Sequence, residues 1–491
     1  MTQGIGRFGP EWARSGADGW SWKIWIAIVG VAVAIDVLVV QSPLVGIGIV
    51  GMLAIGAQFR SELRSLAVVM FTCGLLSYSP FESGLLSRLF PGDIAIVLFI
   101  VMWYVRRRHQ PFKELFQPDL VNGPLLGMTI VAIVSMLWAR LHPDPSVIYS
   151  FPHSDVSWTT TQVAQVVLLG VTVCIPFAVA AAVNTLRDVE YVVLTMGLVA
   201  ALGTIVTAAA MIYGFGGSYD ILGATRAYWE QPWQSSIRLT ELVLPFLYSA
   251  VLFGRRSLPA YRLTCVLFLL CLIGVALTFS RQNWLVSSFG LICVSAFWLR
   301  RNFVILVILF VLVVTLLLAC APDVLTSVTQ FYSPDEVYGL DRIYYYVTAL
   351  QLFLAHPVFG VGAGNYQFFD RIYAEVSAGG ISHNQFFTVA AETGVPGLLM
   401  LTWFIAALMK IPRRLGLWTG DRTERFYWIR VASFVFLLAW VSECFFQEAF
   451  FVTAAAGGGT KVITYTVFPW ILLGLLFAVL RLCRAVYPVK T

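Results

Sequence analysis

Apolar residues run along nearly the whole chain in long blocks that short polar stretches separate. Fourteen of these blocks approach the roughly 20 residues with which a helix crosses about 30 Å of hydrocarbon. They cover about 24–40, 43–59, 65–78, 93–105, 121–139, 163–183, 191–213, 238–254, 262–278, 284–299, 302–321, 384–409, 428–447 and 462–482. Because the alternation typical of barrel strands is absent, each block predicts a membrane-spanning helix. The second to fourth blocks are short, so twelve to fourteen crossings fit the pattern.

The composition excludes a soluble protein. Apolar residues make up 59% of the chain and charged residues 12%, whereas a soluble domain has about 25% charged residues. A soluble enzyme with one anchor would show a single apolar block rather than an end-to-end series. The predicted fold class is therefore all-α, a polytopic transmembrane bundle of 12–14 helices.

The positive charges orient this bundle. With a cytoplasmic N-terminus, the inner segments hold 24 of the 32 lysines and arginines, in line with the positive-inside rule. Residues 1–23 lack an apolar core and a small-residue cleavage site, so they do not predict a signal peptide. The chain then divides into a cytoplasmic segment 1–23, a bundle 24–321 of about eleven spans, an outer loop 322–383 with amphipathic helices, the last three spans in 384–482, and a cytoplasmic tail 483–491.

This topology gives a first testable prediction. Cysteines introduced at Ser333 and Thr419 should react with an impermeant thiol reagent from opposite sides of the membrane, because 322–383 is predicted outside and 410–430 inside. The parent protein is the control, since its native cysteines lie within apolar blocks or at their ends. Labelling of both positions from one side would contradict the map.

Motifs for metals and cofactors are absent from the sequence. It holds no CxxC, no Cys/His cluster with zinc spacing, no P-loop and no GxSxG. We therefore expect no metal, no cofactor and no nucleic-acid partner. Each outer cation is either a solvated surface charge or part of an anion site, and the set comprises Arg88, Arg140, Arg226, Arg238, Arg281, Arg342, Arg371 and Lys461.

Two further groups of side chains are candidates for a site. Arg226 and Arg238 flank an outer loop at 214–237, whose tryptophans suit either sugar stacking or an interfacial belt. Carboxylates inside predicted spans are costly and often functional, although the sequence indicates no partner for them. These carboxylates are Asp36, Glu392, Glu443 and Glu448.

The outer loop predicts an amphipathic helix over Arg342–Ala355, which Pro357 ends. Its aromatic run suits a helix at the membrane interface, and Ile343, Val347, Leu350 and Leu354 share one face. The motif Gly360-Val-Gly-Ala-Gly-Asn365 follows. Its N–H groups either cradle a phosphate or form a tight turn between two helices.

A helix start is predicted at Ser382-His383-Asn384-Gln385, because Ser382 and Gln385 have capping-box spacing. His383 would then lie in the first turn, where free N–H groups favour an anion. Gly394 falls on the same face three turns later, and Pro396 should kink the helix. By position alone, His383 is equally well an interfacial anchor.

These motifs resemble a known family. His383-Asn384, nine residues and Gly394-x-x-Gly397 are similar to the histidine signature of bacterial O-antigen ligases and related Wzy-type polysaccharide polymerases. The stretch from Arg342 to Asn365 looks like the family's segment before that histidine, and Ser280-Arg281-x-x-Trp284 looks like its earlier arginine motif. The likeness is specific over roughly 275–410. Fourteen spans depart from the twelve usual for ligases.

The resemblance implies an inverting, metal-independent glycosyltransferase with a GT-C-like bundle in the bacterial inner membrane. It would act at the outer face in surface polysaccharide or O-antigen assembly. The donor would be a saccharide on undecaprenyl pyrophosphate. The acceptor would be a sugar hydroxyl on a second lipid-linked glycan or on lipid A core.

The chemistry gives the matching residues their expected roles. A histidine titrates near working pH, so His383 is the candidate base for the acceptor hydroxyl. Guanidinium groups bind phosphate through two donors, so Arg281 and Arg342 are the candidates for the pyrophosphate. Further candidates for substrate binding are Arg226, Arg238, Asn384 and Glu443.

Three alternatives remain open at the level of the sequence. The span count slightly favours a polymerase over a ligase that attaches glycan to lipid A core. A polytopic transporter or lipid-linked oligosaccharide flippase has a similar helix number, but an inverted repeat is not visible and the long outer loop is one-sided. A receptor or assembly partner without chemistry would leave His383 unexplained.

Overall fold

The computed structural model describes most of the helical part of the chain. The described residues are 61–76, 91–111, 120–145, 154–212, 234–254, 260–278, 281–299, 338–373, 382–415, 427–445 and 461–486, with a few isolated positions between these ranges. The ranges all belong to one compact unit, Gly51–Thr491. The predicted spans 24–40 and 302–321 and most of 43–59 lie outside them, as do Arg226, Asp36 and Glu448.

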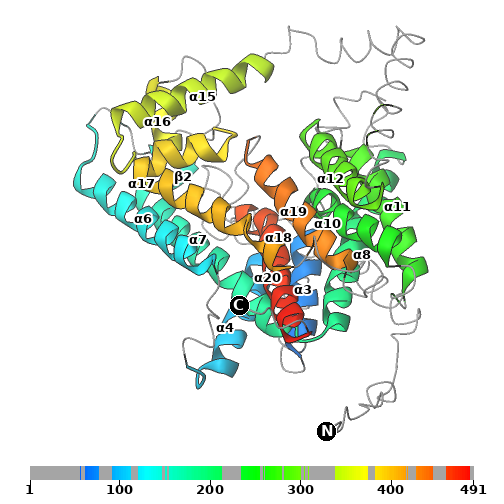
Figure 1. Ribbon diagram of the computed structural model, residues 1–491. Coiled ribbons are helices and arrows are strands. Elements are labelled where there is room, and N and C mark those ends of the chain that lie inside the picture. The colour runs from blue at the N-terminus through cyan, green and yellow to red at the C-terminus, as the bar shows by residue number, and fades with distance from the viewer. Residues whose placement is uncertain are drawn as a thin grey trace, which may run out of the picture. The chain divides into compact units, whose positions relative to one another are not determined.

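Helices account for nearly all of the described residues (Figure 1). Before the outer loop they are α3 (Glu62–Leu75), α4 (Pro91–Arg107), α6 (Asn122–Leu141), α7 (Trp158–Ala182), α8 (Leu186–Ile212), α10 (Gln234–Phe253), α11 (Tyr261–Leu277) and α12 (Arg281–Leu299). In and after the loop they are α15 (Tyr338–Ala355), α16 (Tyr366–Tyr373), α17 (Gln385–Leu408), α18 (Ile411–Arg414), α19 (Tyr427–Glu443) and α20 (Lys461–Val486). The all-α prediction is confirmed.

A small hairpin joins α6 to α7. Strands β1 (Ser150–Phe151) and β2 (Ser154–Ser157) pair antiparallel, with Ser150 opposite Ser157 and Phe151 opposite Ser154. It lies in the connection between two predicted spans, 121–139 and 163–183. The hairpin is a minor addition to a helical fold.

Five helical segments within the described ranges are long and apolar enough to cross a membrane: Asn122–Leu141, Thr161–Ala182, Leu186–Ala209, Gln385–Arg414 and Val467–Arg484. Large apolar side chains on α6 face outward, with Leu126 61% and Leu137 59% exposed. Such an apolar face is unfavourable in water and is suited to contact with lipid tails. The helices therefore fit a multi-pass membrane protein, while the number of crossings stays a prediction.

Aromatic side chains of α17, α19 and α20 meet inside the bundle. Trp440 and Trp470 are fully buried, with ring centroids 5.4 Å apart in a T-shaped pair, and Phe404 packs 6.2 Å from Trp470. On α20, a Cβ at Gly474 would lie 2.6 Å from the carbonyl oxygen of Pro176 on α7. Close approach of this kind provides the dispersion contacts that hold helices together in lipid.

Contacts along three helices set their directions. Tyr248 of α10 hydrogen-bonds Ser295 of α12 at 3.0 Å, and Phe253 packs on Trp298 nearer the other end, so α10 and α12 run parallel. Ser249 of α10 donates to the Trp428 carbonyl at 2.6 Å, whereas Phe246 meets Phe436, so α19 runs antiparallel to both. The first residues of α10 and α12 thus share one end of the bundle with the last residues of α19.

Candidate functional site

His383 lies just before α17 rather than in its first turn. Asn384 is the N-cap, with extended backbone, and its side-chain oxygen accepts the N–H groups of Phe386 and Phe387 at 2.9 and 3.2 Å. The predicted cap at Ser382 was therefore wrong by two residues. Asn384 displaces Ser382 because its carboxamide oxygen reaches two otherwise unpaired N–H groups at once.

The backbone at His383 is left-handed, with φ of 55°. Ser382 is fully buried, and its hydroxyl bonds Thr388 at 2.6 Å and donates to the carbonyl of Asn384 at 2.8 Å. These contacts fix the backbone at Ser382 and Asn384, on either side of the histidine. A non-glycine residue in this region costs on the order of 1–3 kcal/mol and is enriched at functional sites. The strained backbone at the motif histidine supports a functional role for its side chain.

The N-terminus of α17 is not an open anion site. The N–H of Gln385 donates to the Cys444 carbonyl at 2.9 Å, beyond the end of α19. Asn384 occupies the next two N–H groups, and the N–H of Thr388 bonds the Asn384 carbonyl at 3.0 Å. The predicted anion site at the helix start is therefore wrong, because protein acceptors already use these donors.

α17 is broken at Gly394, where φ is 66° and ψ is −157°. Pro396 has no N–H to offer the Glu392 carbonyl four residues before it, so that carbonyl accepts from Gly362 at 2.9 Å instead. The Val395 N–H likewise turns to the Pro357 carbonyl, also at 2.9 Å. The predicted kink is present, and it is centred two residues before the proline.

The glycine motif fills this break. The N–H of Val361 donates to the Ala391 carbonyl at 2.9 Å, and the N–H of Ala363 donates to the Ser135 hydroxyl of α6 at 3.1 Å. The N–H of Gly360 bonds the His356 carbonyl at 3.0 Å. Since these donors are used inside the protein, the structure favours the tight turn over the phosphate cradle.

The structure also gives Glu392 a partner. Its carboxylate is buried and accepts the N–H of Tyr366, the first residue of α16, at 3.2 Å. A negative charge at a helix N-terminus is favourable, because unpaired N–H groups and the helix dipole point toward it. Glu392 therefore anchors α16 to the broken part of α17.

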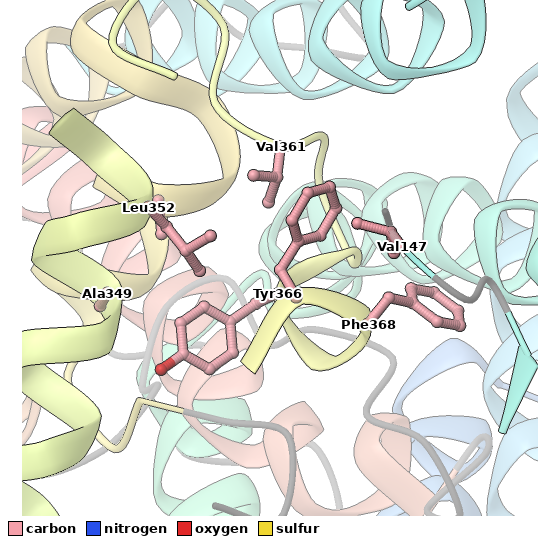
Figure 2. Close-up of a cluster of buried hydrophobic side chains, with 8 residues drawn as sticks. Val147, Ala349, Leu352, Val361, Tyr366 and Phe368 are labelled. Atoms are coloured by element: carbon pink, nitrogen blue, oxygen red, sulfur yellow. The ribbon is translucent and has the colours of Figure 1, made fainter. Parts of the chain in front are cut away.

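A hydrophobic cluster packs the outer-loop helices α15 and α16 against α17. Figure 2 shows Ala349 and Leu352 of α15 facing Tyr366 of α16, with Val361 of the glycine loop above them. Ala391 of α17 completes the contact, and the Tyr366 hydroxyl donates to the Tyr345 carbonyl at 3.2 Å. The outer-loop helices are thus packed against the helix that follows His383.

Aromatic rings lie beside His383 and around the start of α17. The Tyr345 ring centroid lies 5.6 Å from that of His383, and Tyr346 stacks on Phe387 at 5.0 Å. Phe386 packs at 5.0 Å against Phe445, which follows α19 and is 53% exposed. His383 itself is half-buried. The rings offer apolar faces of the kind that pack on sugars.

The opposite face of α15 is exposed. Ile343, Val347, Leu350 and Leu354 are 56%, 45%, 45% and 68% exposed. These are the residues that the sequence placed on one apolar stripe. One side of α15 therefore packs on the protein, and the other suits a membrane interface.

The two pyrophosphate candidates lie on helices α12 and α15. Arg342 lies on α15, three residues before Tyr345, and Arg281 is the first residue of α12. Their side chains lie outside the described part of the structure. The Gln385 N–H donates to the carbonyl of Cys444, which directly follows α19. The start of α17 therefore lies at the bundle end shared by α10, α12 and α19. The charge pattern of the sequence predicts that this end faces outside.

Comparison with known families decides the class. Residues 266–402 match the family model described as O-antigen ligase. This part of the chain is similar to an O-antigen ligase domain. The matched range includes α12, α15, the glycine loop and His383, so the resemblance to the O-antigen ligase and Wzy-type superfamily is confirmed. No curated protein matches the chain.

An O-antigen ligase domain indicates a glycosyltransferase-type enzyme of a bacterial membrane that works on lipid-linked glycans. Asn384 lies within the domain, where the structure gives it a positioning role as cap and anchor. Its side-chain amide donates to the Phe445 carbonyl at 3.2 Å and so ties α17 to the end of α19. This contact sets where His383 stands relative to α19.

A buried ionic cluster lies just outside the O-antigen ligase domain. Arg238 and Glu241 of α10 interact electrostatically with Glu443, the last residue of α19. Sequence reasoning named Arg238 and Glu443 and missed Glu241. The signal was available, because Glu241 is a carboxylate three residues after Arg238 inside an apolar span.

Arg140 shows that an outer cation can be structural. Its guanidinium stacks 4.1 Å from the Trp158 ring and donates to the Thr159 hydroxyl at 2.7 Å. Trp158 in turn donates to the side chain of Asn365 at 2.9 Å. Arg140 thus supports the glycine loop of the O-antigen ligase domain from the start of α7.

Proposed function

We propose that this protein is an inverting, metal-independent glycosyltransferase that takes a saccharide from undecaprenyl pyrophosphate. The acceptor is a sugar hydroxyl at the outer face of the inner membrane, and the product is surface polysaccharide or O-antigen. The observation that carries the proposal is the O-antigen ligase domain together with the strained histidine inside it. The aromatic rings beside His383 support a saccharide substrate.

In this proposal His383 is the general base. It accepts the proton of the acceptor hydroxyl while that oxygen attacks the anomeric carbon. The bond from the anomeric carbon to the pyrophosphate oxygen breaks on the opposite face, so the configuration inverts. Undecaprenyl pyrophosphate leaves with the bonding electrons. The reaction needs no oxidant and no covalent enzyme intermediate.

Arg281 and Arg342 stabilise the leaving pyrophosphate. The hydrogen bonding of the backbone supports this assignment. The N–H groups at the start of α17 and in the glycine loop already donate to acceptors in the protein, so the contacts to pyrophosphate are left to side chains. The guanidinium fork matches the geometry of phosphate oxygens, so arginine is the suitable residue.

This assignment predicts the behaviour of conservative variants. Arg281→Lys and Arg342→Lys should each lose about tenfold or more in kcat/KM, because an ammonium keeps the charge but not the two-donor geometry. Arg140→Lys is the matched control, since Arg140 contacts Trp158 and Thr159 within the protein. Initial rates should stay unchanged in EDTA. Full activity of both lysine variants would remove the arginines from the site.

The product of the reaction separates the candidate functions. The matched domain description favours a ligase as second candidate, whereas the predicted span count slightly favours a polymerase. Purified protein should be incubated with lipid-linked saccharide alone and with lipid A core. A longer lipid-linked glycan identifies a polymerase, and glycan on lipid A core identifies a ligase. Movement of the donor across vesicles without a new glycosidic bond would reject the proposal in favour of a flippase.

A further inference from the structure

The cluster of Arg238, Glu241 and Glu443 is the strongest unassigned feature of the bundle. Both carboxylates are 4% exposed, and each interacts electrostatically with the other and with Arg238. Arg238 is half-buried, so the cluster reaches the surface of the described residues on that side.

Each carboxylate also has unused hydrogen-bonding capacity. Within the described ranges, one side-chain oxygen of Glu241 and one of Glu443 are buried without a hydrogen-bond partner. Such groups are costly in the interior, and apolar residues of similar volume would often be as stable or more stable. Two of them beside each other indicate a site that a ligand with hydrogen-bond donors completes.

The cluster adjoins the start of α17. Glu443 precedes Cys444, whose carbonyl accepts the Gln385 N–H at 2.9 Å. The Phe445 carbonyl accepts the side-chain amide of Asn384, the residue after His383, at 3.2 Å. A molecule bound at the cluster would therefore lie beside the segment that holds the proposed base.

We propose that Arg238, Glu241 and Glu443 form the hydroxyl-binding subsite for the acceptor saccharide, an inference that rests on the proposed function. Carboxyl oxygens accept hydrogen bonds from hydroxyl groups, and a saccharide carries several of these. The guanidinium donates to a hydroxyl or ring oxygen. The exposed ring of Phe445 provides an apolar face for a pyranose.

The hydrogen-bonding groups of the cluster distinguish acceptor from donor. Its carboxylate oxygens can accept from the hydroxyl groups of the acceptor, whereas an ionised donor pyrophosphate has no donor group to offer them. The Arg281 and Arg342 positions lie on other helices, α12 and α15. Acceptor and leaving group would thus be bound by different residues on the two sides of the reacting carbon.

The first test separates the two Michaelis constants. Glu241→Gln and Glu443→Gln should each raise the acceptor KM about tenfold, because the amide nitrogen of glutamine cannot accept a hydrogen bond from a sugar hydroxyl, and should change the donor KM less than about twofold. Glu190→Gln is the control. Glu190 is a buried carboxylate of α8 and lies fourteen residues before Thr204. Thr204 and Thr240 both pack against Gly274, so Thr204 lies level with the start of the cluster at Glu241. It is therefore on the order of 20 Å from the cluster along the helix axis.

The melting temperature distinguishes a binding role of the two carboxylates from a purely structural one. Both glutamine variants should melt at the same temperature as wild type or higher, because glutamine keeps the side-chain volume and removes one of two neighbouring buried carboxyl groups that repel each other when ionised. A lower melting temperature with an unchanged acceptor KM would mean that the cluster only supports the fold, and the subsite would be rejected.

A binding test without turnover completes the design. Glycan released by mild acid from the lipid-linked saccharide of the producing cells should bind wild-type protein in calorimetry and bind Glu241→Gln about tenfold more weakly. Wild-type protein that forms no glycosidic bond with any acceptor contradicts the proposed function itself. Wild-type transfer with unchanged acceptor KM and glycan binding in both variants overturns the subsite alone. An increase in donor KM instead assigns the cluster to the donor and overturns the acceptor inference.

Discussion

His383→Asn should lose about 10²–10⁴-fold in transfer rate, the usual contribution of a general base, while the protein stays folded. Asparagine tolerates the left-handed backbone found at His383, so the substitution removes the base without adding strain. Initial rates with defined lipid-linked donor and acceptor, at matched amounts of purified protein, measure the loss. His383→Ala should lose as much activity. Retention of more than about a tenth of wild-type activity would reduce His383 to an anchor.

His383→Gly sharpens the interpretation of that result. Glycine adopts positive φ without a steric penalty, so this variant should melt at the same temperature as wild type or a few degrees higher. It should be as inactive as His383→Asn. An inactive variant that is at least as stable as wild type shows that the side chain is kept for chemistry. If the glycine variant instead melts well below wild type, the His383 ring is needed for packing against Tyr345.

Gly360→Ala should destabilise the protein by about 3 kcal/mol or more, placing it among the severe single substitutions. The backbone at Gly360 has φ of +62°, and an added Cβ would lie 2.3 Å from the carbonyl carbon of Glu392. That neighbour is backbone and cannot rotate away. The added Cβ would push the glycine loop away from the broken part of α17, where Val361 and Gly362 hydrogen-bond Ala391 and Glu392. Activity should therefore fall together with the melting temperature.

Gly170→Ala is the matched control for this prediction. Gly170 lies within α7, and a Cβ there meets nothing within 4 Å among its surroundings. The alanine should be neutral or slightly stabilising, since alanine favours helix more than glycine does. Melting curves followed by size-exclusion fluorescence in detergent compare the two variants. A Gly360→Ala variant as stable as Gly170→Ala would show that the loop does not pack against α17 as described.

Much of the fold follows from the sequence because lipid restricts the options. In hydrocarbon the backbone must satisfy its own hydrogen bonds, so each long apolar block predicts a helix. Eleven of the fourteen predicted blocks coincide with described helices, including α6, α8 and α20. The family also followed from the sequence, because His383, Gly394 and Arg342 lie in short motifs with fixed spacing. These features depend on local order along the chain, and so the chain alone reveals them.

The tertiary structure decided which polar groups are free to act. From the sequence, the glycine loop and the start of α17 both qualified as anion sites. Contacts from α6, α17 and the end of α19 occupy several of their N–H groups, among them those of Val361, Ala363 and Gln385, and these contacts join residues more than 25 positions apart. The same distance along the chain hid the partner of Glu392 and the pairing of Glu241 with Glu443. Hydrogen bonds and charge pairs across helices depend on packing, because local patterns do not show which helices will meet.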